Sequence, residues 1–245
     1  MHRFYVPSEQ VSSDRIHILG SDAAQIMTVL RMKPGENIEI FDSLGNIYLS
    51  RIKETGKEKV SCIVIEKKRE DIESKIDATL AQCLPKGKKM DLIIQKATEL
   101  GVNSIIPVMS ERSVPKIEEK AERKIDHWQK IAKEAAEQSG RSIIPRISPL
   151  SRFDDIIKSA KSYELALIPW ESEQKNSLKT ILKGIQANLL TGKLLILIGP
   201  EGGFSVPEVN KAVRSGFKSI TLGKRILRTE TAAIALLAQV FYELE

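Results

Sequence analysis

The chain has 245 residues, of which 42% are hydrophobic and 29% are charged, and its formal net charge is +6. This composition is typical of a folded protein and excludes a disordered chain. The length fits one small and one medium domain. The first fifteen residues lack the apolar core of a secretory signal, and no apolar run approaches the length of a membrane span. We therefore expect a cytoplasmic protein without membrane segments.

Cysteine and histidine usage argues against redox or metal chemistry. Cys62 and Cys83 lie in apolar, strand-like contexts and form no CxxC pair, so we expect small buried side chains. The three histidines, His2, His17 and His127, are scattered along the chain, which predicts no metal site. The positive charge permits binding to a polyanion such as nucleic acid, but solvated helix faces would account for it equally well.

The first part of the chain, residues 1–65, has the pattern of short strands and turns. Residues 37–42 and 47–52 alternate polar and apolar side chains around a turn, which predicts a hairpin. Residues 60–65 read as a further strand, and residues 21–31 have helical spacing. Together they predict a compact, mostly β barrel.

The pattern changes after residues 66–75, a charged segment without an apolar face that we interpret as a domain boundary. Domains are accordingly predicted at 1–70 and 71–245. In the second part strands alternate with helices, which predicts an α/β domain with a parallel sheet. The predicted strands are 79–84, 104–109, 164–170, 193–199 and 219–222, and the predicted helices are 88–100, 116–139, 205–216 and 231–244.

A glycine-rich loop, Gly-Pro-Glu-Gly-Gly at 199–203, joins a buried strand to a helix that opens with a capping box. Ligands of α/β sheets bind at such strand ends, and glycines let the backbone approach them. Glu201 would repel a polyphosphate, and the loop lacks the lysine of a P-loop. A ligand with a cationic centre, such as S-adenosylmethionine, suits the loop better. The alternative is a structural turn in which Glu201 caps a neighbouring helix.

The second informative segment, Leu-Gly-Lys-Arg-Ile-Leu-Arg-Thr-Glu-Thr-Ala-Ala at 222–233, places two arginines before the last helix. Arg225 and Arg228 would lie near the glycine-rich loop, where they can hold an anion or a developing negative charge. Their alternative role is a salt bridge with Glu230 at the helix end.

Together these two segments resemble the bacterial 16S ribosomal RNA uridine-N3 methyltransferases, which belong to the SPOUT class of knotted, S-adenosylmethionine-dependent enzymes. The resemblance extends to residues 86–102, 110–113 and 134–141. The start of the chain and residues 29–36 resemble the PUA-like RNA-binding barrel of the same family. The resemblance covers nearly the whole chain.

The resemblance implies a SPOUT-type knotted α/β methyltransferase domain preceded by a small PUA-like β-barrel domain. It also implies a homodimer with its active site at the subunit interface. The expected activity is methylation of N3 of a specific uridine in 16S ribosomal RNA, within the small ribosomal subunit, with S-adenosylmethionine as cofactor. Two alternatives remain open: a ribose 2′-O-methyltransferase of the same class, and a non-catalytic RNA-binding ribosome-assembly factor. A nucleotide-dependent ATPase is disfavoured by the missing lysine.

The roles of the cofactor residues follow from the same resemblance, and the catalytic roles follow from what methylation of uracil N3 requires. Ile226 and Leu227 would sandwich the adenine. Arg228 would stabilise negative charge on the uracil oxygens, and Glu201 or Glu230 would accept the proton. The expected cofactor residues are Ile168, Pro169, Ile198, Gly199, Pro200, Glu201, Gly202, Leu222, Gly223, Ile226, Leu227 and Arg228. The expected RNA contacts are Arg3, Arg31, Lys86, Lys89, Arg112 and Arg141.

Overall fold

The computed structural model describes residues 1–69, 72–113, 121–184 and 192–244. The chain divides into two compact units. The first comprises Met1–Glu73 and Ala136–Ile144, and the second comprises Ser74–Ala135 and Pro145–Glu245. Each has a hydrophobic core of its own. The domain limits expected from the sequence, 1–70 and 71–245, stay a prediction.

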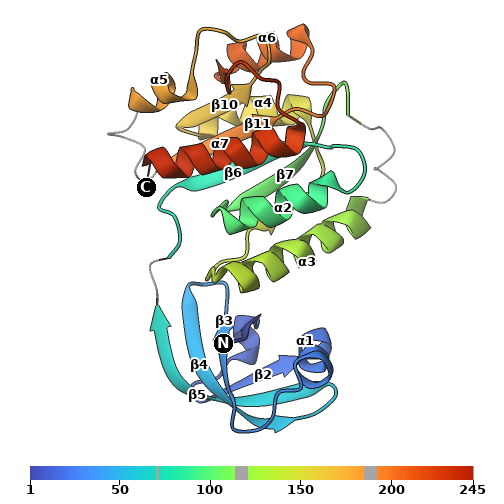
Figure 1. Cartoon of the computed structure of the whole chain (residues 1–245), viewed down its shortest axis with the longest axis vertical. Coiled ribbons are helices and arrows are strands. Elements are labelled where there is room, and N and C mark those ends of the chain that lie inside the picture. Colours follow the sequence, from blue (N-terminus) through green and yellow to red (C-terminus); the bar gives the residue numbers. More distant parts are fainter. Residues whose placement is uncertain (70–71, 114–120, 185–191, 245) are drawn as a thin grey trace. The chain divides into compact units, whose positions relative to one another are not determined.

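The first unit is built on a five-stranded sheet, whose described strands follow the order β1-β3-β4-β5-β2 (Figure 1). Its core includes Ile16, Ile18, Ile38 and Ile40, which are at most 1% exposed. The predicted hairpin is confirmed, because β3 and β4 pair antiparallel from Phe41 opposite Ile47 onward. The elements are β1 (Arg3–Tyr5), a 3-10 turn (Ser8–Gln10), β2 (Arg15–Leu19), α1 (Gly20–Ala24) continued by a π-turn (Gln25–Val29), β3 (Asn37–Phe41), β4 (Asn46–Thr55) and β5 (Lys59–Arg69).

The expected domain boundary at 66–75 contains the division between the two units, after Glu73, but the first four residues of this segment belong to β5. Lys68 and Arg69 pair with Ile47 and Asn46 of β4. The backbone ladder holds this stretch while its charged side chains stay largely exposed, so a lack of apolar side chains did not mean a lack of strand. Residues 70 and 71 lie outside the described part of the chain.

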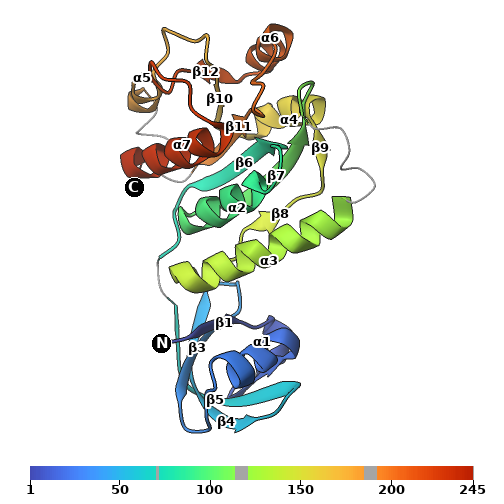
Figure 2. The ribbon, with the colours of Figure 1, turned by 45° about the vertical axis from the view of Figure 1, so that its right-hand side comes forward.

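The second unit contains a parallel seven-stranded sheet within the described residues, ordered β12-β10-β11-β6-β7-β8, with β9 also pairing to β7 (Figures 1 and 2). Helices α2 and α7 lie side by side over one face. The strands are β6 (Asp77–Cys83), β7 (Ser104–Met109), β8 (Arg146–Ile147), β9 (Ser151–Arg152), β10 (Leu165–Pro169), β11 (Lys193–Ile198) and β12 (Lys218–Ile220). The helices are α2 (Lys89–Glu99), α3 (Ala121–Ser139), α4 (Phe153–Ser159), a 3-10 turn (Ala160–Ser162), α5 (Leu178–Lys183), α6 (Val206–Arg214) and α7 (Thr229–Leu244).

The central strands of this sheet are buried on both faces. Every residue from Leu194 to Ile198 is at most 1% exposed, which explains the unbroken apolar run of β11. The predicted α/β class and parallel sheet are confirmed. The part of the predicted third helix at 116–120 lies outside the described residues, and the knotting of the chain stays a prediction.

Both cysteines are buried, as expected. Burial raises the pKa of the Cys62 thiol to about 12 and raises the pKa of Cys83 as well. Within the described residues no helix is long and apolar enough to cross a membrane. No group of three potential metal ligands occurs among those residues either.

Candidate active site

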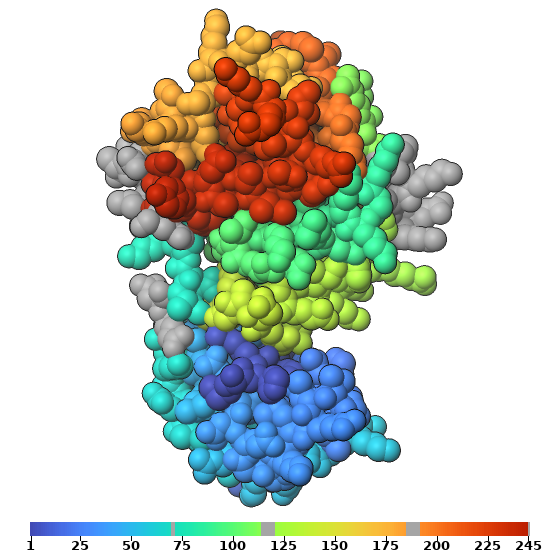
Figure 3. All heavy atoms as spheres, in the orientation of Figure 1, coloured from blue at the N-terminus to red at the C-terminus, as the bar shows by residue number. Residues whose placement is uncertain are grey.

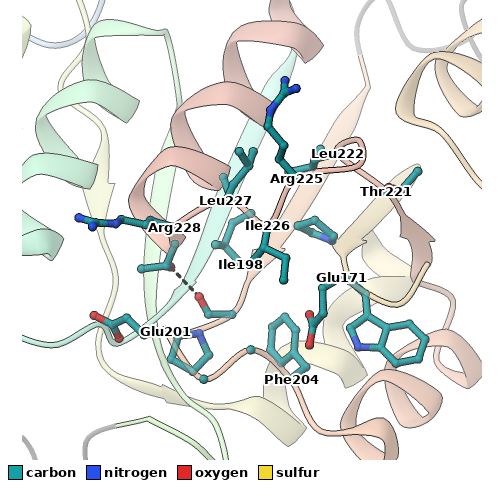
Figure 4. A pocket seen from close by; sticks show the side chains of 18 of the residues that line it. Glu171, Ile198, Glu201, Phe204, Thr221, Leu222, Arg225, Ile226, Leu227 and Arg228 are labelled. Atoms are coloured by element: carbon teal, nitrogen blue, oxygen red, sulfur yellow. Dashed lines mark hydrogen bonds between the residues drawn. The ribbon is translucent and has the colours of Figure 1, made fainter. Parts of the chain in front are cut away.

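A pocket of about 530 Å³ lies at the carboxyl ends of β10 and β11, enclosed by the loop between β12 and α7 (Figure 4). The segment that leads into α7 lies at the surface of the second unit, in red in Figure 3. Eleven of the twelve expected cofactor residues line the pocket: Pro169, Ile198, Gly199, Pro200, Glu201, Gly202, Leu222, Gly223, Ile226, Leu227 and Arg228.

The structure places two of the expected site residues outside the pocket lining. Ile168 is fully buried in the core and does not line the pocket, and Glu230 lies outside the lining too. Further lining residues were not among the expected cofactor residues: Trp170, Glu171, Gly203, Phe204, Thr221, Lys224, Arg225, Thr229 and Ala232. Five of them belong to the two motifs themselves, and the other four lie within two residues of a motif or of an expected cofactor residue.

A buried polar chain fixes the first residue of the glycine-rich loop. The Thr229 hydroxyl donates to the carbonyl of Gly199 at 2.6 Å. Gln82 Nε2 donates to Thr229 Oγ1 at 3.0 Å and to the carbonyl of Cys83 at 2.8 Å. Gln82 is fully buried and Thr229 is 5% exposed. These hydrogen bonds connect the glycine-rich loop to the start of α7 and to the end of β6. They are expected to persist, because breaking them would leave buried polar groups without partners.

Glu201, expected as a possible base, has its carboxylate engaged by two donor groups through three hydrogen bonds. The backbone N–H of Lys86 donates to both oxygens, at 3.0 and 3.2 Å, and Lys89 Nζ lies 2.8 Å from Oε1. Partial burial works to raise the pKa of Glu201, but the hydrogen bonds from Lys89 and from backbone N–H groups outweigh it and lower the pKa. A carboxylate held in this way is a weak proton acceptor.

The two glycines after Glu201 are also held by neighbours. Arg112 Nη1 donates to the carbonyl of Gly202 at 2.7 Å, and its side-chain carbons would lie within 3.4 Å of a Cβ at that position. Gly203 has φ +64°, and a Cβ there would lie 3.0 Å from the Glu171 carboxylate. Side chains from other elements therefore hold the loop at Gly199, Glu201 and Gly202.

Four charged side chains of the pocket lack an ion pair within the described part of the chain. They are Glu171, Lys224, Arg225 and Arg228. The two arginines point away from the centre of the cavity (Figure 4). The salt bridge to Glu230 considered from the sequence is absent among these residues, because the partner of Glu230 is Lys89, at 3.6 Å. The arginines remain available to an anionic ligand.

The six expected RNA contacts divide into two groups. Arg31 and Lys86 are exposed. The other four have partners inside their own unit. In the first unit, Arg3 pairs with Glu39 at 2.9 Å and Arg141 pairs with Glu73 at 2.6 Å. In the second unit, Lys89 and Arg112 hold the glycine-rich loop, as described above.

Comparison with known proteins agrees with this geometry. The family model described as an RNA methyltransferase domain matches residues 72–241, and the model of an RNA methyltransferase PUA domain matches residues 26–65. The chain is 36% identical over 250 residues to ribosomal RNA small subunit methyltransferase E of Bacillus subtilis, covering 100% of this chain and 98% of that protein. It is 35% identical to the Mesomycoplasma hyopneumoniae protein of the same name, covering 98% of each.

Solved structures give the same result. The chain resembles ribosomal RNA small subunit methyltransferase E of Neisseria gonorrhoeae bound to S-adenosylmethionine, with a TM-score of 0.86, 33% identity, and coverage of 98% and 96%. It resembles a putative Legionella pneumophila methyltransferase in complex with the same cofactor, with a TM-score of 0.88 and 32% identity, at the same coverage. The fold and pocket are thus those of an RNA methyltransferase. The chain belongs to the ribosomal RNA small subunit methyltransferase E family.

Proposed function

We propose that this protein methylates N3 of a specific uridine in 16S ribosomal RNA, using S-adenosylmethionine as the methyl donor. The observation that carries the proposal is the three-loop pocket, with apolar walls, a glycine-rich backbone and two unpaired arginines, in a chain whose structural relatives hold that cofactor. The RNA is proposed to be bound within the small ribosomal subunit, in the cytoplasm, by a homodimer.

The residues of the pocket suit S-adenosylmethionine chemically. Ile198, Leu222 and Leu227 supply an apolar surface for the adenine. Backbone N–H groups and carbonyls of the glycine-rich loop suit the polar parts of the molecule. Glu171 offers a carboxylate that no described residue engages, which suits hydroxyl or ammonium groups. When bound, the cofactor supplies an electrophilic methyl group.

Residues of the protein must supply the remaining chemistry. Uracil N3 must lose its proton, and the negative charge that develops on O2 and O4 needs a cation. We assign that cation to Arg228, which lines the pocket and has no ion pair within the described residues. Of the two expected acceptors, Glu230 suits the role better than Glu201, because Glu230 Oε2 accepts no hydrogen bond from the described residues and its ion pair with Lys89 is longer, at 3.6 Å.

The RNA-binding surface is proposed to include Arg31 and Lys86, whose side chains are exposed in their respective units. Arg3, Lys89, Arg112 and Arg141 are left out of it, because their charges are already used inside the protein. Residues 1–70 are proposed to form the PUA-like domain.

The decisive experiment compares the modified nucleosides of 16S ribosomal RNA from cells with and without this protein. We expect 3-methyluridine to be lost from the RNA when the protein is absent and to return when the purified protein and S-adenosylmethionine are added. A missing ribose methyl would instead support a 2′-O-methyltransferase. An unchanged nucleoside profile, together with no binding of S-adenosylmethionine in calorimetry, would leave only a non-catalytic RNA-binding role.

Gly203 offers a test of the loop geometry. In Gly203→Ala the alanine must keep a left-handed backbone conformation, which destabilises an L-residue by about 1–2 kcal/mol. Its Cβ would lie 3.0 Å from the Glu171 carboxylate, which must shift to make room. We expect weaker binding of S-adenosylmethionine, measured by calorimetry. The matched control is Gly216→Ala, at φ +109° with no neighbour within 4 Å and outside the pocket lining, which should affect stability alone. Equal cofactor affinity in both variants would contradict the proposed role of the loop.

A further inference from the structure

Lys89 occupies a position that its sequence neighbourhood does not suggest. It is the first residue of α2, in a run of three lysines, Lys86, Lys88 and Lys89, that looks like a phosphate-binding surface. Yet its side chain lines the pocket, and its Nζ lies 2.8 Å from Glu201 Oε1 and 3.6 Å from Glu230 Oε2. One ammonium group therefore stands between the two carboxylates that the sequence predicted as proton acceptors.

Within the described residues, Lys89 is the only cation that pairs with the two carboxylates beside it. Glu201 and Glu230 have no other ion pair there, and their side chains are 27% and 14% exposed. The hydrogen bond to Glu201 is the main cause that raises the pKa of Lys89, and the same bond helps to lower the pKa of Glu201. Without the ammonium group, two partly buried carboxylates would be left without a cation.

The contact also connects two elements that build the pocket. Glu201 lies in the middle of the glycine-rich loop, and Lys89 begins the helix that packs beside α7. The loop is held at Gly199 by Thr229 and at Gly202 by Arg112. Between these points its position depends on the Glu201 carboxylate, which is fixed by Lys89 and by the backbone N–H of Lys86.

We propose that Lys89 is a positioning residue for methyl transfer: it fixes the glycine-rich loop through Glu201, holds Glu230 beside the pocket, and does not contact RNA phosphates. This inference rests on the proposed function for its catalytic consequence. Its structural part concerns the loop alone and is testable without cofactor or RNA.

The test compares Lys89→Met, which keeps most of the aliphatic stem and removes the charge, with Lys86→Met. Lys86 is exposed, and its backbone N–H, which holds Glu201, survives the substitution. In Lys89→Met we expect faster hydrogen exchange of the backbone amides of residues 199–203 in the ligand-free protein. We also expect an S-adenosylmethionine Kd raised about tenfold, and an unchanged salt slope of RNA binding. Lys89→Arg should restore the loop exchange and the cofactor Kd toward those of the wild type.

Lys86→Met should behave in the opposite way. Its loop exchange and cofactor Kd should match the wild type, while the log–log salt slope of RNA binding should fall by about one, as for the loss of one phosphate contact. If Lys89→Met leaves the loop exchange unchanged, or lowers the salt slope by about one, the positioning role is overturned. If the wild type itself fails to bind S-adenosylmethionine, the proposed function falls, and the exchange measurement still decides the structural role of Lys89.

Discussion

Arg228→Ala should lower kcat/KM for RNA methylation by about 10²–10³-fold, the effect of removing one preorganised group that stabilises transition-state charge. Arg228 lines the pocket and has no ion pair within the described residues, so its charge does not stabilise the fold through such a pair. We therefore expect thermal stability to change little. Steady-state kinetics with an RNA substrate, alongside thermal melts of the free protein, measure the two effects separately.

Arg225→Ala is the matched control. Arg225 belongs to the same segment, is exposed, and has no ion pair in the described part of the chain either. It lies three residues before Arg228 in the chain, and its loss should have a much smaller effect on kcat. Full turnover by Arg228→Ala with unchanged affinity for S-adenosylmethionine would remove Arg228 from the mechanism.

Thr229→Val should destabilise the protein by about 1–3 kcal/mol, because it leaves buried polar groups without partners. Valine has nearly the shape of threonine, yet it neither donates to the Gly199 carbonyl nor accepts from Gln82 Nε2. Gly199 and Thr229 line the pocket, so the affinity for S-adenosylmethionine should fall as well. Urea unfolding and calorimetry are the measurements.

A double-mutant cycle shows whether these residues act as one unit. Gln82→Leu removes the donor to Thr229, and combining it with Thr229→Val should give a loss of stability well below the sum of the single losses. Thr229→Ser, which keeps the hydroxyl, should retain most of the stability. Strict additivity, or a Thr229→Val variant as stable as the wild type, would show that the buried chain does not hold the loop.

Elements with strong local signals could be predicted from the sequence. The capping box at the start of α6 is confirmed, because the Ser205 hydroxyl accepts from the backbone of Glu208 and the Glu208 carboxylate accepts from the backbone of Ser205. The apolar run of β11 and the glycine-rich loop after it were predictable for the same reason. Each depends on residues next to one another in the chain.

Pairings between distant residues could not be predicted in this way. Lys89, Arg112 and Arg141 were expected to contact RNA because of their charge, and each has a partner far away in sequence instead. The partner of a charged side chain depends on which elements the fold brings together, which no local pattern contains. The exposure of an apolar side chain could not be predicted in this way either. Ile226 was expected to sandwich the adenine; it lines the pocket, but its side chain is 86% exposed in this structure.

Short elements gave no signal at all. β8 and β9 have two residues each, too few for an alternating pattern to be recognised. β5 was recognised but ended too early in the prediction, because its charged last residues are stabilised by backbone pairing with β4. Strand pairing thus overrode side-chain composition at this point.

The burial of both cysteines has a practical consequence for measurements on this enzyme. Cys62 and Cys83 are at most 1% exposed, and their raised pKa values keep them in the unreactive thiol form at neutral pH. Maleimide reagents therefore meet almost no native background in the folded protein. A single cysteine introduced at the exposed position of Tyr242 becomes a selective attachment point for a fluorophore or spin label, without removal of any native residue from the core.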